Sequence, residues 1–471
     1  MSVAALVYEI PFIDHITMPN GATWMWKHLG PPHPDMQVQK DRGGPLTWEY
    51  AKHGRLGWMQ FFYDWRFADL DGDGKMDFIL ICGTFRQIAY RQDGSILWKY
   101  EDPNGTLMDI RYDSNFPVYD IDGDGAPEFI CPRRVGDKMH LCIVNAATGE
   151  VKKSVPFPHC QELPKNPKFG HLRCSITIVN TSGRKRPQDI LLYWDYRCLS
   201  LLDENLNVRW TRKIEEMPKR KHGVFGHTPN AGDLNGDGYD EILMSSVLFD
   251  RDGKVLWAAA DLPALLADNH ADSVQIVKLA GDDNRPNMVM STGAYCFDAD
   301  GNLMFGYDKL KHGQAQRTGK IRNDVPGVQM VVYEGASRVD PNLPDKVLAL
   351  DNTGKLLWER EVVQPDMQEG GFGFWLGDWN GDGLDEIFVN DPEKVLVLDG
   401  WGKLIDTIPD HLIYVFDLVG DSRAEAVTLD TIEPGMKLKI VTNDKPNPNP
   451  ATNKIIQRRQ TTPAMYNCTR Y

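Results

Sequence analysis

The sequence DLDGDGKMDFI, at residues 69–79, recurs along the chain with little change. The other close copies are DIDGDGAPEFI (120–130), DLNGDGYDEIL (233–243) and DWNGDGLDEIF (378–388). Weaker copies start at residues 179, 278, 320 and 417, which makes eight units in all. Their starts lie about 50 residues apart, a period that is typical of solenoids and propellers.

Each unit has the pattern of four short antiparallel strands. A Gly/Asp loop follows an inner strand and precedes a run of β-branched and aromatic residues, such as 77–81. A turn with glycine then opens an outer strand that ends on an aromatic residue, as in DGSILW (93–98), DGKVLW (252–257), DGNLMF (300–305) and TGKLLW (353–358). Helix signals are nearly absent. We therefore predict an all-β fold, an eight-bladed β-propeller.

The eighth unit has too few residues after 441 to complete its blade. NGATWMWKH (20–28) resembles an outer strand that has no unit of its own. We therefore expect segment 1–30 to supply the missing strand and close the ring, which removes an open sheet edge. Residues 1–471 are then a single propeller domain, and 443–471 is a C-terminal tail that packs on it.

The close copies carry side-chain oxygens at loop positions 1, 3, 5 and 9. These residues are Asp69, Asp71, Asp73, Asp77; Asp120, Asp122, Asp124, Glu128; Asp233, Asn235, Asp237, Glu241; and Asp378, Asn380, Asp382, Glu386. Oxygen ligands at alternate positions, with a glycine at position 6 for the sharp turn, follow the logic of an EF-hand loop. Plain hairpin turns are the alternative, since Asp and Gly are common there. Four loops with one ligand set favour several Ca²⁺ ions with a mainly structural role.

The weaker units have lost this ligand set, because Lys278, Ala280 and Lys320 cannot coordinate calcium through their side chains. Their turns must close without metal.

A second set of residues lies just before the loops, where the inner strands of a propeller line a central funnel that can bind ligands. His171, His270 and His312 each stand eight residues before loop position 1, and Tyr112 has the same offset. His227 stands six residues before its loop. Nearby in sequence are Asp113, Arg173, Asn230, Asp272, Gln314 and Arg317. Imidazole, phenol and guanidinium groups that converge in this way suit an anionic ligand.

Such a set can perform β-elimination on a uronic acid. The sugar carboxylate must be neutralised so that a base can take the proton on carbon 5, and an acid assists departure of the oxygen on carbon 4. The candidate base is His227 or His171, Tyr112 is the acid or its partner, and Arg173 and Arg317 would neutralise the carboxylate. The candidate substrate-binding residues are Asp113, Asn230, His270, His312 and Gln314. The spacing equally allows the funnel histidines to hold a metal ion. A Ca²⁺ site in the central funnel is therefore an alternative role for them.

Composition restricts the other classes. The net charge is −14 and no basic stripe is present, which argues against a nucleic-acid partner. No apolar run is long enough to span a bilayer, and residues 1–15 lack the pattern of a secretory leader. A monomer is expected.

Two other functions compete with a lyase. A glycoside hydrolase would need an isolated carboxylate pair, and a carbohydrate-binding or adhesion propeller would need only the loops. The strict loops contain sixteen acidic residues, so much of the charge belongs to ligands.

The chain resembles the rhamnogalacturonan lyases of polysaccharide lyase family 11, which are eight-bladed propellers that bind several calcium ions. The resemblance lies in residues 109–130, 226–243, 269–290, 311–332 and 417–442. It implies β-elimination at a rhamnose–uronic acid (1→4) linkage in a plant pectin or arabinogalactan-type glycan, calcium dependence and secretion. Related propeller lyases cut rhamnose from glucuronate. His270 and His312 match positions that the family uses around calcium.

Overall fold

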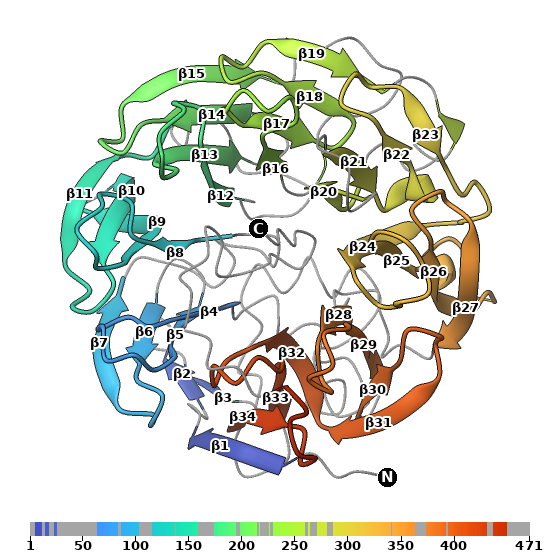
Figure 1. Ribbon diagram of the computed structural model, residues 1–471. Coiled ribbons are helices and arrows are strands. Elements are labelled where there is room, and N and C mark those ends of the chain that lie inside the picture. Colours follow the sequence, from blue (N-terminus) through green and yellow to red (C-terminus); the bar gives the residue numbers. More distant parts are fainter. Residues whose placement is uncertain are drawn as a thin grey trace.

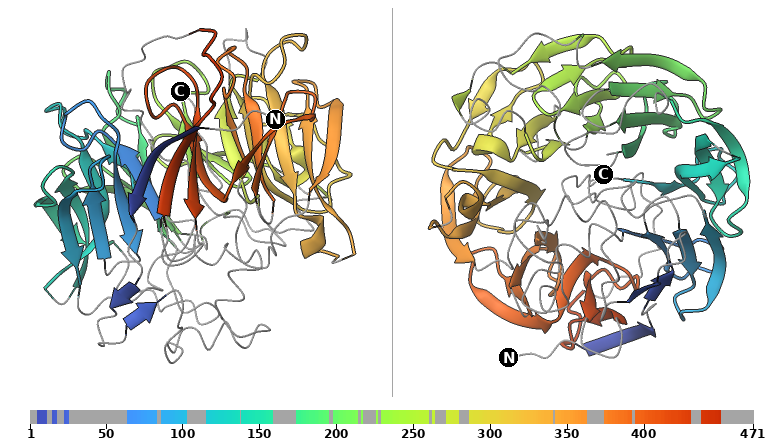
Figure 2. Two further views of the ribbon diagram at one scale, coloured as in Figure 1. Left: turned by 90° about the horizontal axis from the view of Figure 1, so that it is seen from below. Right: turned by 180° about the vertical axis from the view of Figure 1, so that it is seen from behind.

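The structure is a computed structural model, and it describes most of the repeat region. The described residues are 5–11, 15–17, 23–25, 64–82, 86–102, 115–136, 138–158, 174–194, 198–213, 216, 226, 229–259, 262–263, 271–279, 286–340, 342–362, 374–391, 394–430 and 437–449. Eight four-stranded antiparallel sheets surround a central axis, which confirms the predicted eight-bladed propeller (Figure 1). Seen from the edge of the ring, the sheets stand upright next to one another (Figure 2).

Blades 1 to 4 each consist of four strands that are consecutive in the chain. Blade 1 contains β4 (Asp64–Ala68), β5 (Asp77–Cys82), β6 (Arg86–Tyr90) and β7 (Ile96–Glu101). Blade 2 contains β8 (Val118–Tyr119), β9 (Glu128–Val135), β10 (Lys138–Asn145) and β11 (Val151–Pro156). Blade 3 contains β12 (Cys174–Val179), β13 (Asp189–Trp194), β14 (Cys198–Leu202) and β15 (Val208–Lys213). Blade 4 contains β16 (Pro229–Gly232), β17 (Glu241–Met244), β18 (Val247–Phe249) and β19 (Val255–Ala258).

Blades 5 to 7 repeat this order, and blades 5 and 6 each contain a short 3-10 turn. Blade 5 contains β20 (Val274–Val277), β21 (Asn287–Met290), η3 (Thr292–Ala294), β22 (Cys296–Phe297) and β23 (Leu303–Phe305). Blade 6 contains β24 (Gly313–Gly319), β25 (Gln329–Glu334), η4 (Ala336–Arg338), β26 (Asp345–Leu350) and β27 (Leu356–Val362). Blade 7 contains β28 (Phe374–Gly377), β29 (Glu386–Asp391), β30 (Lys394–Leu398) and β31 (Leu404–Pro409).

Blade 8 combines the two ends of the chain. Three of its strands are β32 (His411–Phe416), β33 (Glu425–Asp430) and β34 (Lys437–Thr442), and the outer one is β1 (Ala5–Pro11), antiparallel to β34. The N-terminal region therefore closes the ring as predicted, but the strand that does so is not residues 20–28. Within that stretch, β3 (Thr23–Met25) pairs instead with β2 (His15–Thr17) in a separate two-stranded sheet.

The hydrophobic core lies between neighbouring sheets. Between blades 3 and 4, for example, Tyr193 and Leu199 pack in one cluster with Ile242 and Phe249. The inner three strands of blade 3 are buried along their whole length, whereas the outer strand β15 is largely exposed. Five cysteines, at positions 131, 142, 174, 198 and 296, are buried free thiols. No helix among the described residues is long and apolar enough to span a membrane.

The outer-strand aromatic residues link one blade to the next. The ring of Trp98, in blade 1, covers Gly149 in the turn of blade 2, and its Nε1–H donates to the carbonyl of Ala146 at 2.7 Å. The same aromatic–glycine contact recurs in the pairs Trp210–Gly253, Trp257–Gly301, Phe305–Gly354 and Trp358–Gly402. In these five blades, the glycine of the outer hairpin therefore leaves room for the neighbouring ring.

Polar side chains of the inner strands also join blades. In blade 1, Arg66 is fully buried and its Nε–H donates to the carbonyl of Phe116, next to β8, at 2.7 Å. Further along, the Nδ2 of Asn115 donates to the carbonyl of Ile176 in β12 at 3.2 Å. Polar inner-strand residues thus fill the narrow space where neighbouring blades converge.

Candidate calcium loops and a His–Gln–Asp cluster

Hydrogen bonds from its own backbone N–H groups to its aspartates fix the conformation of the loop between β4 and β5. Both carboxylate oxygens of Asp69 accept from backbone N–H groups, Oδ1 from Gly72 at 2.8 Å and Oδ2 from Gly74 at 3.0 Å. Both glycines have positive φ, 79° and 85°, so the turn requires them. At the far end of the loop, Asp77 Oδ2 accepts from the N–H of Leu70 at 3.1 Å.

The other strict loops repeat this arrangement. The first aspartate of each accepts from two glycine N–H groups, and the ninth residue accepts from the second N–H. These bonds are Asp120–Gly123, Asp120–Gly125 and Glu128–Ile121; Asp233–Gly236, Asp233–Gly238 and Glu241–Leu234; and Asp378–Gly381, Asp378–Gly383 and Glu386–Trp379. The repeated sequence therefore specifies one loop conformation with its acidic side chains gathered on one side.

The donor set of these loops is suited to a hard cation. The carboxylate oxygens of Asp69, Asp71 and Asp77 lie within 4.8 Å of one another, close enough to share an ion. Asp71 occupies the third loop position. Its Oδ2 accepts a hydrogen bond from the Nε–H of Arg91, an exposed residue, at 2.9 Å. In blades 4 and 7 the third position is an asparagine beside the ninth-position glutamate, as for Asn235 and Glu241 at 3.1 Å.

The ninth-position carboxylates have pKa values that indicate unbalanced negative charge. Burial, together with nearby loop carboxylates, raises the pKa of Glu386 to about 8 and that of Glu241 to about 7. Burial likewise raises the pKa of Asp77 to about 6. A divalent cation would favour the ionised carboxylates and remove this cost. The loops of blades 1, 4 and 7 therefore fit calcium by their oxygen donors and by their need for positive charge.

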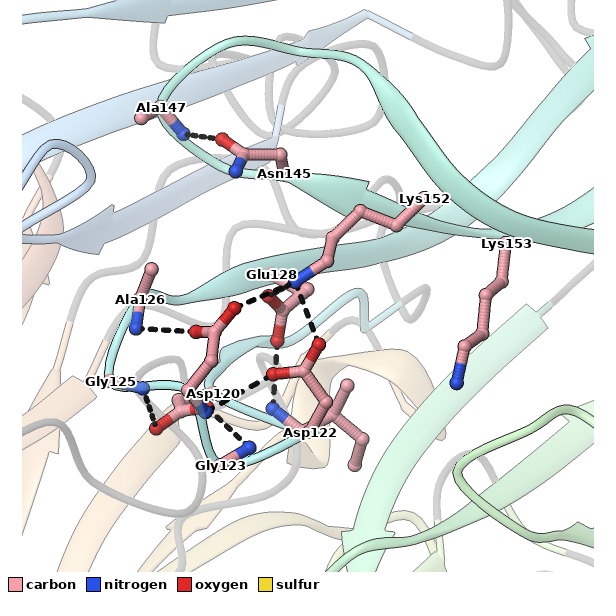
Figure 3. Close-up of polar contacts among 12 residues, drawn as sticks. Asp120, Asp122, Gly123, Gly125, Ala126, Glu128, Asn145, Ala147, Lys152 and Lys153 are labelled. Carbon is pink, nitrogen blue, oxygen red and sulfur yellow. Dashed lines mark hydrogen bonds and ion pairs between the residues drawn. The ribbon is translucent and has the colours of Figure 1, made fainter.

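The loop of blade 2 differs because one lysine contacts three of its acidic residues at once (Figure 3). The Nζ of Lys152, in β11, lies 2.7 Å from Asp122 Oδ2, 3.1 Å from Asp124 Oδ2 and 2.7 Å from Glu128 Oε1. Burial alone would lower the pKa of Lys152, but its hydrogen bonds to these carboxylates outweigh that effect and raise it. The remaining aspartate, Asp120, is paired through Oδ2 with Arg186 Nη1 at 2.6 Å.

The weaker loop of blade 6 uses a lysine from its own sequence. Lys320 occupies the first loop position, and its Nζ donates to the backbone carbonyls of Val325 at 2.6 Å and Gly327 at 2.8 Å. The side chain of Gln329 accepts from the N–H of Ile321 at 3.1 Å, as the ninth-position carboxylate does in the strict loops. The loop keeps its turn with an ammonium group inside it, in line with the expectation that such loops close without metal.

A separate polar cluster joins blades 5 and 6 near the axis. His312 Nε2 lies 3.1 Å from Asp272 Oδ2 and 2.8 Å from Gln314 Oε1, and Gln314 Nε2 donates to Asp272 Oδ2 at 3.0 Å. Asp272 and Gln314 are 4% and 1% exposed, and the His312 side chain is 14% exposed. His312 and Gln314 were both expected in the central funnel, and Asp272 follows the predicted His270. One nitrogen and two oxygens at these distances form a set that can hold a metal ion or a substrate.

Two other predicted site residues are described, and both lie between blades. The Oδ1 of Asn230, which is fully buried, accepts from the N–H of Ile276 at 3.1 Å. Arg317 is 3% exposed, its Nε–H donates to the carbonyl of Phe374 at 2.7 Å, and its guanidinium lies 4.1 Å from the ring centroid of Trp375. These contacts link blades 4 to 5 and 6 to 7, and the expected roles in substrate binding and catalysis stay predictions.

The remaining candidates lie outside the described residues. They are Tyr112, Asp113, His171, Arg173, His227 and His270. The residues missed by the sequence analysis are Lys152 and Arg186. A signal for Lys152 did exist, because blades 1 and 4 carry leucine at the same outer-strand position, Leu97 and Leu256.

The comparisons with known proteins identify the class of fold. The structure of rhamnogalacturonan lyase YesW has a TM-score of 0.60, with 18% identity over 94% of this chain and 77% of that chain. The Vibrio cholerae biofilm matrix protein Bap1 has a TM-score of 0.55 at 15% identity, covering 83% of this chain and 89% of Bap1. No family model matches the chain. These similarities show the propeller fold, which lyases share with a matrix protein.

The sequence relatives are more specific. The chain is 23% identical over 245 residues to the rhamnogalacturonan exolyase YesX of Bacillus subtilis, covering 41% of this chain and 39% of YesX. It is 23% identical over 368 residues to the rhamnogalacturonan endolyase YesW of that organism, covering 68% of this chain and 56% of YesW. The matches thus span about two fifths and just over half of these relatives. They confirm the resemblance to rhamnogalacturonan lyases.

Proposed function

We propose that the chain is a polysaccharide lyase that cleaves a rhamnose–uronic acid (1→4) linkage by β-elimination and leaves an unsaturated uronate. The observation that carries this proposal is the sequence similarity to an exolyase and an endolyase that both act on rhamnogalacturonan. Because the matches span only part of each relative, activity and substrate are inferred for this chain.

The cluster between blades 5 and 6 supports this chemistry. β-Elimination requires positive charge at the uronate carboxylate, since this makes the proton on carbon 5 more acidic. The donors that would hold a Ca²⁺ ion there are His312 Nε2, Gln314 Oε1 and Asp272 Oδ2, and the two oxygens lie 2.8 and 3.1 Å from His312 Nε2. When bound, the ion would supply the charge that neutralises the sugar carboxylate. Buried Asp272 and Gln314 hold His312 in place, so the site is organised before substrate arrives.

Proton transfer is assigned to residues outside the described part of the chain. His227 or His171 would take the proton from carbon 5, and Tyr112 would assist departure of the oxygen on carbon 4. Arg173, with Arg317 and His270, would act on the carboxylate, and Asp113 and Asn230 would orient the sugar. In this proposal the substrate is an acidic plant polysaccharide or oligosaccharide, and an enzyme for such a polymer would act outside the cell.

The decisive experiment supplies the chain with calcium and either rhamnogalacturonan or a gum-arabic-type glycan. A rise in ultraviolet absorbance from the unsaturated uronate is expected if the chain is a lyase. Released sugar without this absorbance would instead indicate a glycoside hydrolase. Neither signal, together with measurable glycan binding, would favour a carbohydrate-binding propeller, the second candidate, which is motivated by the fold of the matrix protein Bap1.

Variants connect the activity to the cluster. His312→Ala removes the Nε2 that lies between Asp272 and Gln314, and we expect a loss of kcat/KM of about 10- to 100-fold. His140→Ala is the matched control, since His140 lies in β10 and contacts Ser154 Oγ at 3.3 Å, away from the cluster. Full activity of the His312 variant would contradict the proposed site.

A further inference from the structure

In blades 2 and 3, the side chain at the β-bulge of the outer strand contacts the loop of its own blade. In blade 1 the register between β6 and β7 shifts between Ala89 and Tyr90, so that Leu97 is the bulged residue. The bulges of blades 4 and 7 contain Leu256 and Ile405. A bulge turns its extra residue away from the regular alternation. Three of the four strict loops therefore have an apolar side chain at this position.

Blade 2 has a lysine at the same structural position. The register between β10 and β11 shifts between Ile143 and Val144, which makes Lys152 the bulged residue. Its ammonium contacts carboxylates at loop positions 3, 5 and 9, at 2.7 to 3.1 Å. Calcium binds oxygen ligands at about 2.3–2.6 Å, so an ion shared by these three carboxylates would require the place that the ammonium fills.

Blade 3 provides an independent case. Its bulged residue is Arg209, and its loop lacks the calcium ligands. Arg209 Nη1 donates to Thr181 Oγ1 and to Ser182 Oγ, each at 3.0 Å, and lies 3.4 Å from Asp189 Oδ2. A cation at the bulge thus contacts a loop that lacks the ligand set of the strict loops. Blade 2 combines this cation with a complete ligand sequence.

The remaining ligand of the blade 2 loop, Asp120 at position 1, is also paired with a cation. Arg186, from the loop of blade 3, pairs with Asp120 Oδ2 at 2.6 Å and also donates to the Asp120 carbonyl. We infer that Lys152 acts as a built-in counter-ion and that the loop at residues 120–128 does not bind calcium. Its sequence matches the loops that fit the ion, and oxygens of Asp120, Asp122 and Glu128 lie within 4.8 Å of one another, so the ammonium is what distinguishes this loop. The strict loops would then bind three ions, those at 69–77, 233–241 and 378–386.

Counting bound calcium tests this inference, and the count does not depend on lyase activity. Lys152→Leu gives blade 2 the residue found in blades 1 and 4, and we expect it to bind one more Ca²⁺ per chain than the wild type, measured by equilibrium dialysis. Lys153→Leu is the control, because Lys153 points away from the loop and donates to Asn205 Oδ1 at 2.7 Å (Figure 3). It should leave the count unchanged. Equal counts in wild type and Lys152→Leu would overturn the inference.

A second measurement uses the wild-type chain and so does not depend on how the variant folds. Crystals soaked in terbium, which replaces calcium and scatters anomalously, should show no ion between Asp122 and Glu128. An anomalous peak there, with Lys152 turned outward, would overturn the inference.

Discussion

Replacing Gly149 with alanine tests the contact between neighbouring blades. Gly149 has a φ of 76°, so any side chain there costs about 1–2 kcal/mol. An added Cβ would also lie 2.7 Å from Cδ2 of Trp98, so the indole ring must move. Such overpacking costs about 1–3 kcal/mol, which includes weakening of the bond from Trp98 Nε1 to Ala146.

Gly136→Ala is the matched control in the same blade. Gly136 has a φ of 64°, and a Cβ there would meet no atom within 4 Å, so only the backbone cost of about 1–2 kcal/mol applies. The expected difference between the two variants is therefore about 2 kcal/mol. With an unfolding entropy of about 2.1 cal/mol/K per residue, a chain of 471 residues loses about 1 °C of Tm per kcal/mol. Scanning calorimetry should show Gly149→Ala melting about 2 °C below Gly136→Ala.

Removing the ring of Trp98 tests whether the clash with the indole causes this cost. In a Trp98→Ala background the clash is gone, so Gly149→Ala should cost no more than Gly136→Ala. An undiminished cost in that background, or equal Tm values for the two single variants, would show that the indole does not limit this turn.

Two further predictions concern the loops. Removing calcium with EDTA should lower the Tm of the wild-type chain, because crowded carboxylates such as those of Asp69, Asp71 and Asp77 lose their counter-ion; an unmoved Tm would refute calcium binding. Without metal, burial raises the pKa of Glu386 to about 8 in the folded chain, compared with 4.5 for an ordinary glutamate. At a pH between these two values, the folded state therefore binds more protons than the unfolded state. Stability should therefore fall as pH rises from 5 to 8, by at most about 1.4 kcal/mol per pH unit, and Glu386→Gln should flatten the slope measured by calorimetry.

The repeat made the fold predictable, and the ring closure shows where the pattern misled. Eight units of one loop and four strands dictate eight blades, because each sheet must cover the next. The closing strand was sought at residues 20–28 because that stretch imitates an outer strand after a glycine turn. The actual strand, Ala5–Pro11, pairs with β34, which lies more than 400 residues later in the chain, so the two are not joined by the hairpin turn that carries the repeated motif.

The candidate site was predictable only where spacing reports position. The common offset predicts a funnel position for His312, and the structure brings its imidazole beside Gln314 and Asp272. Spacing does not reveal which bonds such a residue makes to the next blade, as Arg317 does with Phe374. It also does not reveal Lys152, whose ammonium reaches a carboxylate 30 residues earlier in the chain.

The composite eighth blade orders events during synthesis. β1 leaves the ribosome before the strands of blades 1 to 7, whereas its partner β34 ends at Thr442. At about 5–20 residues per second, roughly 20 to 90 s pass between the emergence of β1 and that of β34, and the ring stays open during this time. Seven blades can form in sequence during that time, but the last joint waits until β34 has emerged. Closure therefore acts as a completeness check, since a chain that stops early lacks the partner that covers its first strand.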